Sequence, residues 1–436
     1  MSGFLRSSES LIVMLLFIMS ASPFHDCAYS SRFEGNSVVQ DSIRQAFNDT
    51  VSGIGARSFW MTLGPGNSVY AVAFNDSREL IDQGKYELFL HKWDFQANHI
   101  WTAIWDAGDI AIPNAIAADA SGVLVTGRGF DDKVWVGKWD HNGNQLWYRT
   151  WQKSPWQEGA AIAALNDGSI LAGCLVRGPL VDDHIYNHTF DLLKYTSSGN
   201  LVWSKTAEWY LDESGHPQGF GSFNIHVLQQ NEVYFSTPYS LFEVADEGVG
   251  LRIWWWNTSS FYTRRNLSPD GIFYSTSGLT VSGRTANGST SFNITFQLVP
   301  WQYSPSLWGI RGWKDRSVFV LQSYSNDVGS HLMLQKYNHH GTQIWNKTLQ
   351  YGGSLVHADR VKEFLFSDSG CAYFLVQDAR SDLIVMDLLV YEIEGPCVGY
   401  VDTGGFNPII VGVILLGAFA AVAVVLSRRF IMRKTS

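Results

Sequence analysis

The side chains best suited to bind a metal ion are carboxylates and imidazoles that occur close together in the sequence. The densest such stretch contains Asp182, Asp183, His184 and His188. Oxygen and nitrogen ligands at this spacing can hold a divalent cation. A sequon at Asn187 lies in the same stretch, and this favours a solvated polar loop over residues 177–188. His339 and His340 fall in a predicted turn, where polar residues are expected in any case. We therefore predict no metal site and no bound cofactor.

The sequence contains none of the short motifs that identify common enzymes. It has no G-x-S-x-G elbow, no H-E-x-x-H pair and no P-loop, each of which places a nucleophile, a metal or a phosphate in a defined local geometry. Carboxylates that meet across a channel from different repeats would leave no local motif. An enzyme acting on polysaccharide or on a quinone substrate therefore stays open as the alternative, although non-catalytic binding is favoured.

Aromatic residues suggest a binding surface instead. The chain has 18 tryptophans, and some of them lie outside the repeated positions described below. Exposed aromatic rings next to polar groups would suit a sugar or a peptide. Irregular core filling is the competing interpretation of these residues. The ligand-binding candidates are Trp255, Trp256, Trp301, Trp308 and Trp313.

One short phrase occurs four times along the chain. Each copy has an apolar strand that ends in an aromatic residue, then a polar turn, then a second strand with a tryptophan. The copies are KWDFQANHIW, KWDHNGNQLW, KYTSSGNLVW and KYNHHGTQIW, at residues 92–101, 138–147, 194–203 and 336–345. An all-β unit that recurs about every 50 residues is typical of a β-propeller blade. We expect the repeated tryptophans to pack one blade against the next; they are Trp93, Trp101, Trp139, Trp147, Trp203 and Trp345.

The turn between the first two strands of each blade can be followed along the whole sequence. It is predicted at residues 65–67, 120–122, 166–168, 230–231, 269–271, 315–316 and 368–370. The third strands are predicted at residues 86–94, 133–140, 189–196, 240–246, 292–299, 331–338 and 383–393. The fourth strand of the fifth blade has no assigned position near residues 301–308. The pattern predicts an all-β, seven-bladed propeller over residues 29–395.

The seventh blade has no copy of the fourth strand after its third strand. Before the first blade, however, Gly35 and Asn36 precede two valines, as in the fourth strands of other blades. We predict that residues 37–42 form the outer strand of the last blade, because such closure removes an open sheet edge.

The repeated letters also resemble a known family. The pattern W-D-x-x-G-N-x-x-W occurs at Trp139, Asp140, Gly143, Asn144 and Trp147, and A-x-A-I-A-x-D-x-S-G-x-x-x-V-T-G is partly matched at residues 115–119, 121–122 and 125–127. These letters are similar to the seven-bladed β-propeller (SBBP) repeats of prokaryotic surface proteins. The resemblance covers the first three blades and the sixth, and it is faint over residues 241–313. It implies a propeller fold and an extracellular location, but no reaction.

Both ends of the chain are apolar. Residues 1–28 are predicted to be a secretory signal, with one basic residue before a short apolar core. A longer apolar run starts at Ile409, ends at Leu426 and is followed by four basic residues. It is long enough for a transmembrane helix over residues 408–427, and the basic tail at residues 428–436 indicates a cytoplasmic end. Residues 396–407 would be a linker. The chain is thus predicted to be a single-pass, type I protein of the cell membrane.

Composition agrees with an exported domain. The net charge of −9 argues against binding to nucleic acid. Of the four cysteines, Cys174 and Cys371 are expected to be small buried residues of different blades and not a bridge to each other. The sequons predict glycosylation at Asn48, Asn75, Asn187, Asn257, Asn266, Asn287, Asn293 and Asn346. The sequence therefore favours a non-catalytic surface protein that recognises or scaffolds a glycan or another surface protein.

Overall fold

The computed structural model describes most of the residues between 56 and 392. It describes residues 56–75, 87–95, 98–106, 111–129, 131–182, 185–212, 224–228, 232–236, 240–245, 248–255, 265–267, 272–277, 280–284, 290–295, 303–313, 316–326, 329–351, 354–355, 361–367, 370–380 and 383–392. The chain divides into two compact units, Met1–Val39 and Gln40–Ser436, and all described residues belong to the second.

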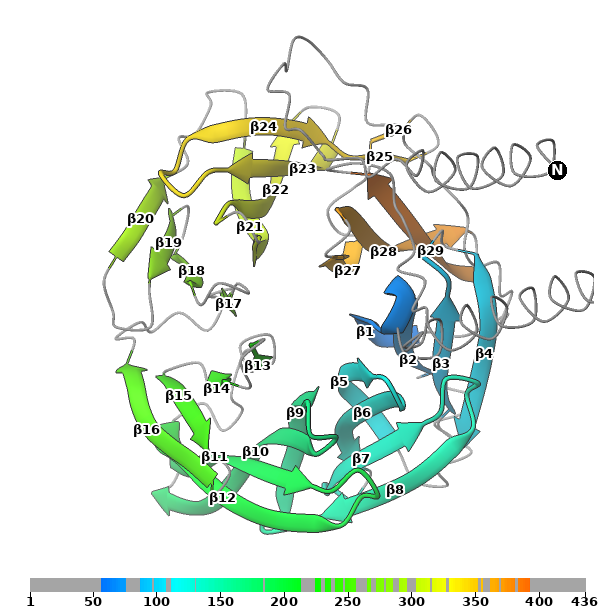
Figure 1. Cartoon of the computed structure of the whole chain (residues 1–436), viewed down its shortest axis with the longest axis vertical. Coiled ribbons are helices and arrows are strands. Elements are labelled where there is room, and N and C mark those ends of the chain that lie inside the picture. The colour runs from blue at the N-terminus through cyan, green and yellow to red at the C-terminus, as the bar shows by residue number, and fades with distance from the viewer. Residues whose placement is uncertain are drawn as a thin grey trace, which may run out of the picture. The chain divides into compact units, whose positions relative to one another are not determined.

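The first three sheets contain four antiparallel strands each, arranged in sequence order (Figure 1). Sheet 1 contains β1 (Ala56–Leu63), β2 (Val69–Asn75), β3 (Glu87–Trp93) and β4 (His99–Asp106), with a short 3-10 turn, η1 (Pro65–Asn67), between its first two strands. Sheet 2 contains β5 (Ala111–Asp119), β6 (Gly122–Gly129), β7 (Val134–Trp139) and β8 (Gln145–Trp151). Sheet 3 contains β9 (Trp156–Ala164), β10 (Ile170–Asp182), β11 (Ile185–Tyr195) and β12 (Leu201–Asp212).

The later sheets continue the same pattern. Sheet 4 contains β13 (Asn224–Val227), β14 (Val233–Ser236), β15 (Ser240–Ala245) and β16 (Gly248–Trp255). Sheet 5 contains β17 (Arg265–Leu267), β18 (Phe273–Ser277), β19 (Thr280–Arg284) and β20 (Thr290–Thr295). Sheet 6 contains β21 (Tyr303–Gly312), β22 (Val318–Asn326), β23 (Gly329–Tyr337) and β24 (Gln343–Thr348). Among the described residues, sheet 7 has three strands, β27 (Val361–Phe366), β28 (Cys371–Arg380) and β29 (Leu383–Glu392), and a separate pair joins β25 (Gln350–Tyr351) to β26 (Ser354–Leu355).

Apolar side chains on the faces of the sheets pack against neighbouring sheets. Separate clusters of buried side chains join sheet 1 to sheet 2, sheet 2 to sheet 3, and sheet 3 to sheet 4. Further clusters join sheet 5 to sheet 6, sheet 6 to sheet 7, and sheet 7 back to sheet 1. Burial on both faces explains why the middle strands are almost continuously apolar, as in β7, whose six residues are all buried. Consecutive four-stranded antiparallel sheets packed in this way are consistent with a β-propeller.

The turns predicted from the sequence agree with this topology. Each of the seven predicted turns falls between the first and second strands of a sheet. The predicted third strands overlap β3, β7, β11, β15, β23 and β29. Three glycines in these turns have positive φ: Gly66 at 67°, Gly168 at 80° and Gly370 at 92°. This conformation is one that other residue types rarely adopt.

Two predictions about strands were wrong. Residues 292–299 overlap β20, the fourth strand of sheet 5, whereas its third strand is β19. The region near residues 301–308 contains the start of β21, the first strand of sheet 6. The predicted polar loop at residues 177–188 is instead a hairpin, in which Arg177 pairs with His188 and β10 continues to Asp182. The polar residues of this segment suggested a solvated loop, but the structure pairs them across the two strands.

The predicted signal at residues 1–28, the closing strand at residues 37–42, and the linker, transmembrane and tail segments at residues 396–436 lie outside the described residues. None of the elements that the structure describes is a helix with the length and apolar character that a membrane crossing requires.

Candidate functional site

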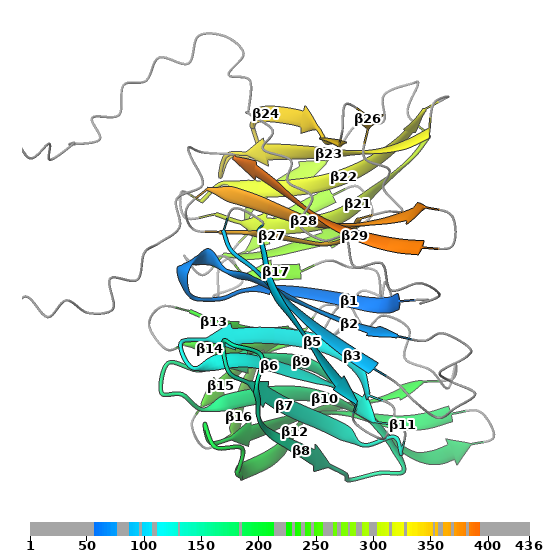
Figure 2. The same ribbon diagram turned by 90° about the vertical axis from the view of Figure 1, so that its right-hand side faces the viewer.

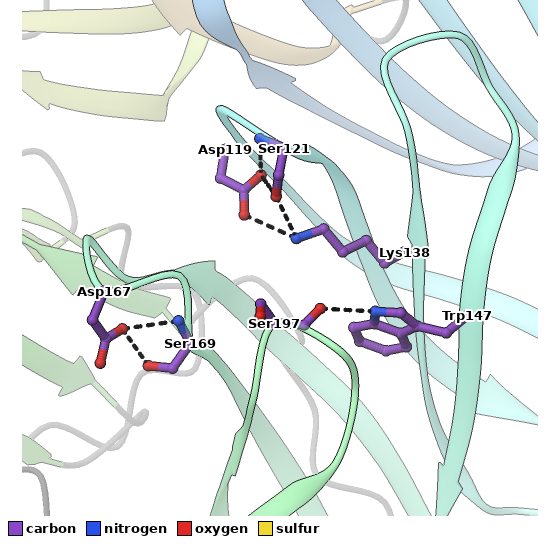
Figure 3. A network of polar contacts seen from close by, with 7 residues as sticks. All are labelled: Asp119, Ser121, Lys138, Trp147, Asp167, Ser169 and Ser197. Carbon is purple, nitrogen blue, oxygen red and sulfur yellow. Dashed lines mark hydrogen bonds and ion pairs between the residues drawn. The ribbon is translucent and has the colours of Figure 1, made fainter.

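A polar triad occurs at the turn between the first two strands of sheet 2 (Figure 3). The Asp119 carboxylate accepts hydrogen bonds from the backbone N–H of Ser121 at 2.6 Å and from its hydroxyl at 2.7 Å. The buried Lys138 ammonium donates to Asp119 Oδ2 at 3.1 Å and to Ser121 Oγ at 2.7 Å. In sheet 3, Asp167 accepts the same two hydrogen bonds from Ser169. The triad therefore links the third strand of a sheet to its own first turn.

A second repeated contact links the fourth strands of sheets 1 and 2 to the sheet that follows each of them. The Trp101 indole donates to the carbonyl oxygen of His141 at 3.0 Å, and the Trp147 indole donates to that of Ser197 at 3.0 Å. Figure 3 shows Trp147 of sheet 2 directed at Ser197 of sheet 3. Both acceptors lie in the turn between the third and fourth strands of the following sheet.

These turns fit closely against the indole rings. A Cβ added at Gly199 would lie 2.7 Å from the Trp147 ring, and one added at Gly143 would lie 3.3 Å from the Trp101 ring. A side chain does not fit at Gly199 without displacement of the ring. At Gly143 and Gly199, glycine therefore serves packing between sheets as well as the turn conformation.

The boundary between sheets 3 and 4 departs from this arrangement. In sheets 2 and 3 the turn before the fourth strand spans residues 140–144 and 196–200, closed by a hydrogen bond from its first N–H to its last carbonyl. In sheet 4 the register pairs Ala245 directly with Gly248, so only two residues connect β15 to β16. By this register the link between β15 and β16 is three residues shorter than the corresponding links of sheets 2 and 3.

A pocket of about 330 Å³ lies at this boundary. This volume is at the lower end of the range for small-ligand sites. The pocket combines a buried apolar floor, a partly buried indole, an ammonium group and exposed polar residues at its edge. Its lining residues are Leu165, Asn166, Asp167, Leu171, Lys194, Trp203, Val227, Val233, Val244 and Ala245.

The pocket holds both charge signs at neutral pH. Hydrogen bonds from Ser169 and, to a smaller extent, the charge of Lys194 hold the pKa of Asp167 below its usual value. Lys194 is the direct cross-strand partner of Trp203, so the ammonium group and the indole project from neighbouring strands on one face of the sheet. Such a pocket can bind a polar group over the indole while apolar atoms contact the floor.

The five tryptophans predicted to bind a ligand differ in where the structure places them. Trp313 is only 4% exposed and packs edge-on against Phe319, with ring centroids 5.4 Å apart. It is a core residue between sheets 6 and 7, so the prediction of an exposed ring is wrong for this residue. The backbone of Trp255 ends β16 and that of Trp308 lies within β21. Trp256 and Trp301 are outside the described residues.

The predicted packing role of the repeated tryptophans is confirmed by their burial. Trp93 and Trp139 are fully buried, and the four others are partly buried against clusters between sheets. Trp203 has an additional role that sequence reasoning missed, because it also lines the pocket. The sequence did contain one sign that this boundary is different: the Gly-Asn letters are absent after the third strand of sheet 4.

The remaining candidates occupy varied positions. Asn293 and Asn346 are exposed on fourth strands, and Asn187 is half-buried in β11. Asn75 and Asn266 lie in β2 and β17, while Asn48, Asn257 and Asn287 lie outside the described residues. Asn293 and Asn346 are therefore more exposed than Asn187.

The acidic and histidine residues do not gather into a metal site in the part of the chain that the structure describes. His188 is fully buried in β11, while Asp183 and His184 fall outside the described residues. His339 and His340 are exposed neighbours in the turn before β24, as predicted. Cys174 is a free, buried thiol, and Cys371 is disulfide-bonded to a residue other than Cys174.

No family model and no curated protein matches the chain significantly. Three solved structures share a distant similarity of fold. A protein of unknown function from Bacteroides caccae is 12% identical with a TM-score of 0.36, over 61% of this chain and 92% of that chain. BBS1N in complex with ARL6DN is 10% identical with a TM-score of 0.41, over 83% of this chain and 100% of that chain. A structure from a study of two prolyl endopeptidases is 14% identical with a TM-score of 0.45, over 78% of this chain and 47% of that chain. At these values the similarities identify no ligand, partner or activity.

Proposed function

We propose that the protein is a non-catalytic recognition module, a seven-bladed β-propeller held at the outer surface of the cell. The seven predicted turns, each between the first two strands of a sheet, support the blade number. The apolar segments at residues 1–28 and 408–427 support export and a single membrane anchor. The ligand would be a glycan or another surface protein.

The pocket between sheets 3 and 4 is the observation that carries this proposal. It joins an indole, an ammonium and a carboxylate to an apolar floor, which is the composition of a binding site with a few polar groups that fix orientation. A rigid sheet framework positions these groups, so a ligand meets a preformed surface. The proposal assigns recognition to this site and no reaction.

A binding screen on the full-length protein in detergent tests the proposal. Arrays of glycans and of extracellular proteins would be probed with the wild type, with Trp203→Ala and with Val202→Ala. Val202 is the adjacent residue, is 55% exposed, and is absent from the pocket lining, so it is the matched control. We expect at least one ligand whose binding is lost in Trp203→Ala and kept in Val202→Ala.

Two results would contradict the proposal. Ligand binding that is insensitive to Trp203→Ala would move the site elsewhere on the molecule. Turnover of a polysaccharide or a quinone by the wild type, in the absence of any stable ligand, would favour the alternative of an ectoenzyme.

A further inference from the structure

The disulfide bond of Cys371 has a partner that can be identified from the rest of the chain. The protein contains four cysteines, Cys27, Cys174, Cys371 and Cys397. Cys371 is disulfide-bonded, whereas Cys174 is a free thiol in the core between sheets 2 and 3. The partner of Cys371 is therefore Cys27 or Cys397, both of which lie outside the described residues.

Cys371 occupies a fixed position at the start of β28. The N–H of Ser367 donates to the carbonyl oxygen of Cys371 at 2.9 Å, and the N–H of Cys371 donates to the Ser367 hydroxyl at 3.2 Å. The Cys371 side chain is fully buried in the cluster that sheet 7 shares with sheet 1. Because the turn and the strand hold Cys371 in place, the chain must bring the other cysteine to it.

The end of β29 brings Cys397 close to this position. The register pairs Cys371 directly with Glu392, where β29 ends, and paired residues have Cα atoms about 4.5–5.5 Å apart. Cys397 follows Glu392 by five residues, and such a segment spans at most about 17 Å. Gly395 and Pro396, which are common in turns, precede Cys397. A disulfide needs Cα atoms about 4.4–6.8 Å apart, and this short segment can return to that distance.

Cys27 is the poorer partner for three reasons. It lies in the predicted signal at residues 1–28, which cleavage would remove. It belongs to the compact unit Met1–Val39, whereas Cys371 and Cys397 both belong to the unit Gln40–Ser436. A bond to Cys27 would also close a far longer loop, and the entropic cost of closure rises with loop length.

We infer that Cys371 is bonded to Cys397 and that this bond clamps the end of sheet 7 from which the chain continues to its membrane anchor. The oxidant is the disulfide of a thiol carrier, which exporting compartments supply. One cysteine thiolate breaks the S–S bond of the carrier and releases one carrier thiol, and the other thiolate displaces the second. The two protons and two electrons of the cysteines thus end on the carrier. The role at the membrane rests on the proposed function, whereas the bond itself does not.

The position of the bond determines how tension on the anchor would reach the sheet. The predicted transmembrane segment begins at residue 408, so tension would enter sheet 7 at Glu392. Without the bond, β29 would separate from β28 one pair at a time, beginning with Glu392 and Cys371. With the bond, tension passes from Cys397 into β28, which pairs with both β27 and β29. The last strand of the sheet is thereby protected from peeling.

A peptide map of the full-length protein in detergent, made without reduction, tests the bond. Free thiols would be alkylated before digestion with trypsin, and linked peptides identified by mass spectrometry. We expect residues 363–380 to be linked to residues 381–428, and Cys174 to be alkylated. The linked species should be lost in Cys397→Ser and kept in the control Cys174→Ser. A free Cys371 thiol, or a bond from Cys371 to Cys27, would overturn the inference.

Hydrogen exchange over β29 tests the clamp. In Cys397→Ser, the amides of residues 383–392 should exchange about tenfold or more faster than in the wild type, because the end of β29 can then open locally. Cys174→Ser should keep the wild-type rates in this strand. Unchanged exchange over β29 in Cys397→Ser, or an equal increase in all sheets, would overturn the clamp.

The outcomes for this bond and for the proposed function can be told apart. A linked peptide and a protected β29 in a protein that binds nothing in the ligand screen would support the clamp and refute recognition. Ligand binding by a protein that lacks the linked peptide would refute the clamp alone.

Discussion

Glu158 in β9 is a carboxyl group in an environment that disfavours its charge. Only 3% of its surface is exposed, and its Oε1 accepts no hydrogen bond. Burial raises the pKa of Glu158 to about 8, opposed by the charge of Arg128 and increased by that of Asp132. The folded protein therefore holds this side chain in its protonated form at neutral pH. Its place between sheets 2 and 3, away from the pocket, indicates a cost to stability at high pH and no role in binding.

Replacement of Glu158 by Gln should change the pH dependence of stability. The unfolded group has a pKa near 4.5, so the contribution of the protonated carboxyl is fully present below that value. It is lost progressively as the pH rises to about 8. At pH 8.5 we expect Glu158→Gln to be more stable than the wild type by up to about 5 kcal/mol. At pH 4 the two should differ little, as measured by denaturant unfolding. Glu243→Gln, on the exposed side of β15, is the control. The same difference at both pH values would contradict this account.

The repeated triad allows a comparison of buried and exposed charges. In sheet 2, Lys138 is 2% exposed and pairs with Asp119 at 3.1 Å. Burial tends to raise the pKa of Asp119, but hydrogen bonds from Ser121 and the charge of Lys138 keep it below its usual value. Asp119→Ala would leave the Lys138 ammonium buried without this partner, and we expect a loss of about 3 kcal/mol in unfolding free energy. Asp167→Ala removes the equivalent, exposed residue of sheet 3 and should cost about 1 kcal/mol or less. Equal losses in thermal unfolding would show that burial does not decide the cost.

At the scale of the element, two turns of sheet 3 differ in what they require of their glycine. Gly168 lies between the first and second strands, and Gly199 lies between the third and fourth. Gly168 and Gly199 both have positive φ, at 80° and 83°. A Cβ at Gly168 would meet only Ser197 at 3.9 Å, whereas one at Gly199 would lie 2.7 Å from the Trp147 ring. A substitution at Gly168 therefore tests backbone strain alone, whereas a substitution at Gly199 tests both backbone strain and packing between sheets.

Alanine at each of these glycines should show the two effects separately. Gly168→Ala should cost about 1–2 kcal/mol, the strain of a left-handed conformation. Gly199→Ala should cost at least about 1 kcal/mol more, because the indole must move. Near-ultraviolet circular dichroism should change only in Gly199→Ala, where a tryptophan is displaced. A smaller loss for Gly199→Ala than for Gly168→Ala in denaturant unfolding would refute this explanation of the repeat.

Strands and turns that are determined by the local sequence could be predicted. Features that depend on contacts between sheets could not. Turn residues such as Gly122 and Gly370 mark positions between strands whatever surrounds them, so the order of strands was readable in most sheets. Sheet 5 lacks the Lys-Trp and Gly-Asn letters, and the predicted third strand coincides with its fourth strand, β20. The hairpin through His188 was missed because its polar letters are paired across strands. Trp203 occupies the same position of the repeated phrase as the other packing tryptophans, whereas the pocket that it lines also needs residues of sheet 4.

At the scale of the whole molecule, the last sheet packs against the first, because buried side chains of sheets 7 and 1 form one cluster. Figure 2 allows the strands of both to be followed. On β4, Ile104 is the cross-strand partner of Phe89, which packs in the cluster shared with sheet 7. Ile104 is nevertheless 62% exposed, and Ile100 on the same face is 51% exposed. In sheet 2 the corresponding face of the fourth strand carries Tyr148, whose ring lies 4.9 Å from Trp105 of the preceding fourth strand. Among the described residues, sheet 7 has no fourth strand that could make such a contact with β4.

The closing strand predicted at residues 37–42 would supply this contact, and the prediction stays open to test. Deletion of residues 31–45 should lower the melting temperature by roughly 5 °C or more, because it would expose the edge of β29 and the face of β4. Deletion of residues 43–45 alone leaves the predicted strand intact and is the control. The substitution Ile104→Ser adds a separate test. A side chain that is exposed in the native protein tolerates such a change within about 0.5 kcal/mol, whereas one covered by a fourth strand should cost about 1–2 kcal/mol in the full chain and little after the deletion. An unchanged melting temperature on deletion, together with a neutral Ile104→Ser, would mean that sheet 7 remains three-stranded and that its outer edge is free to pair with another chain.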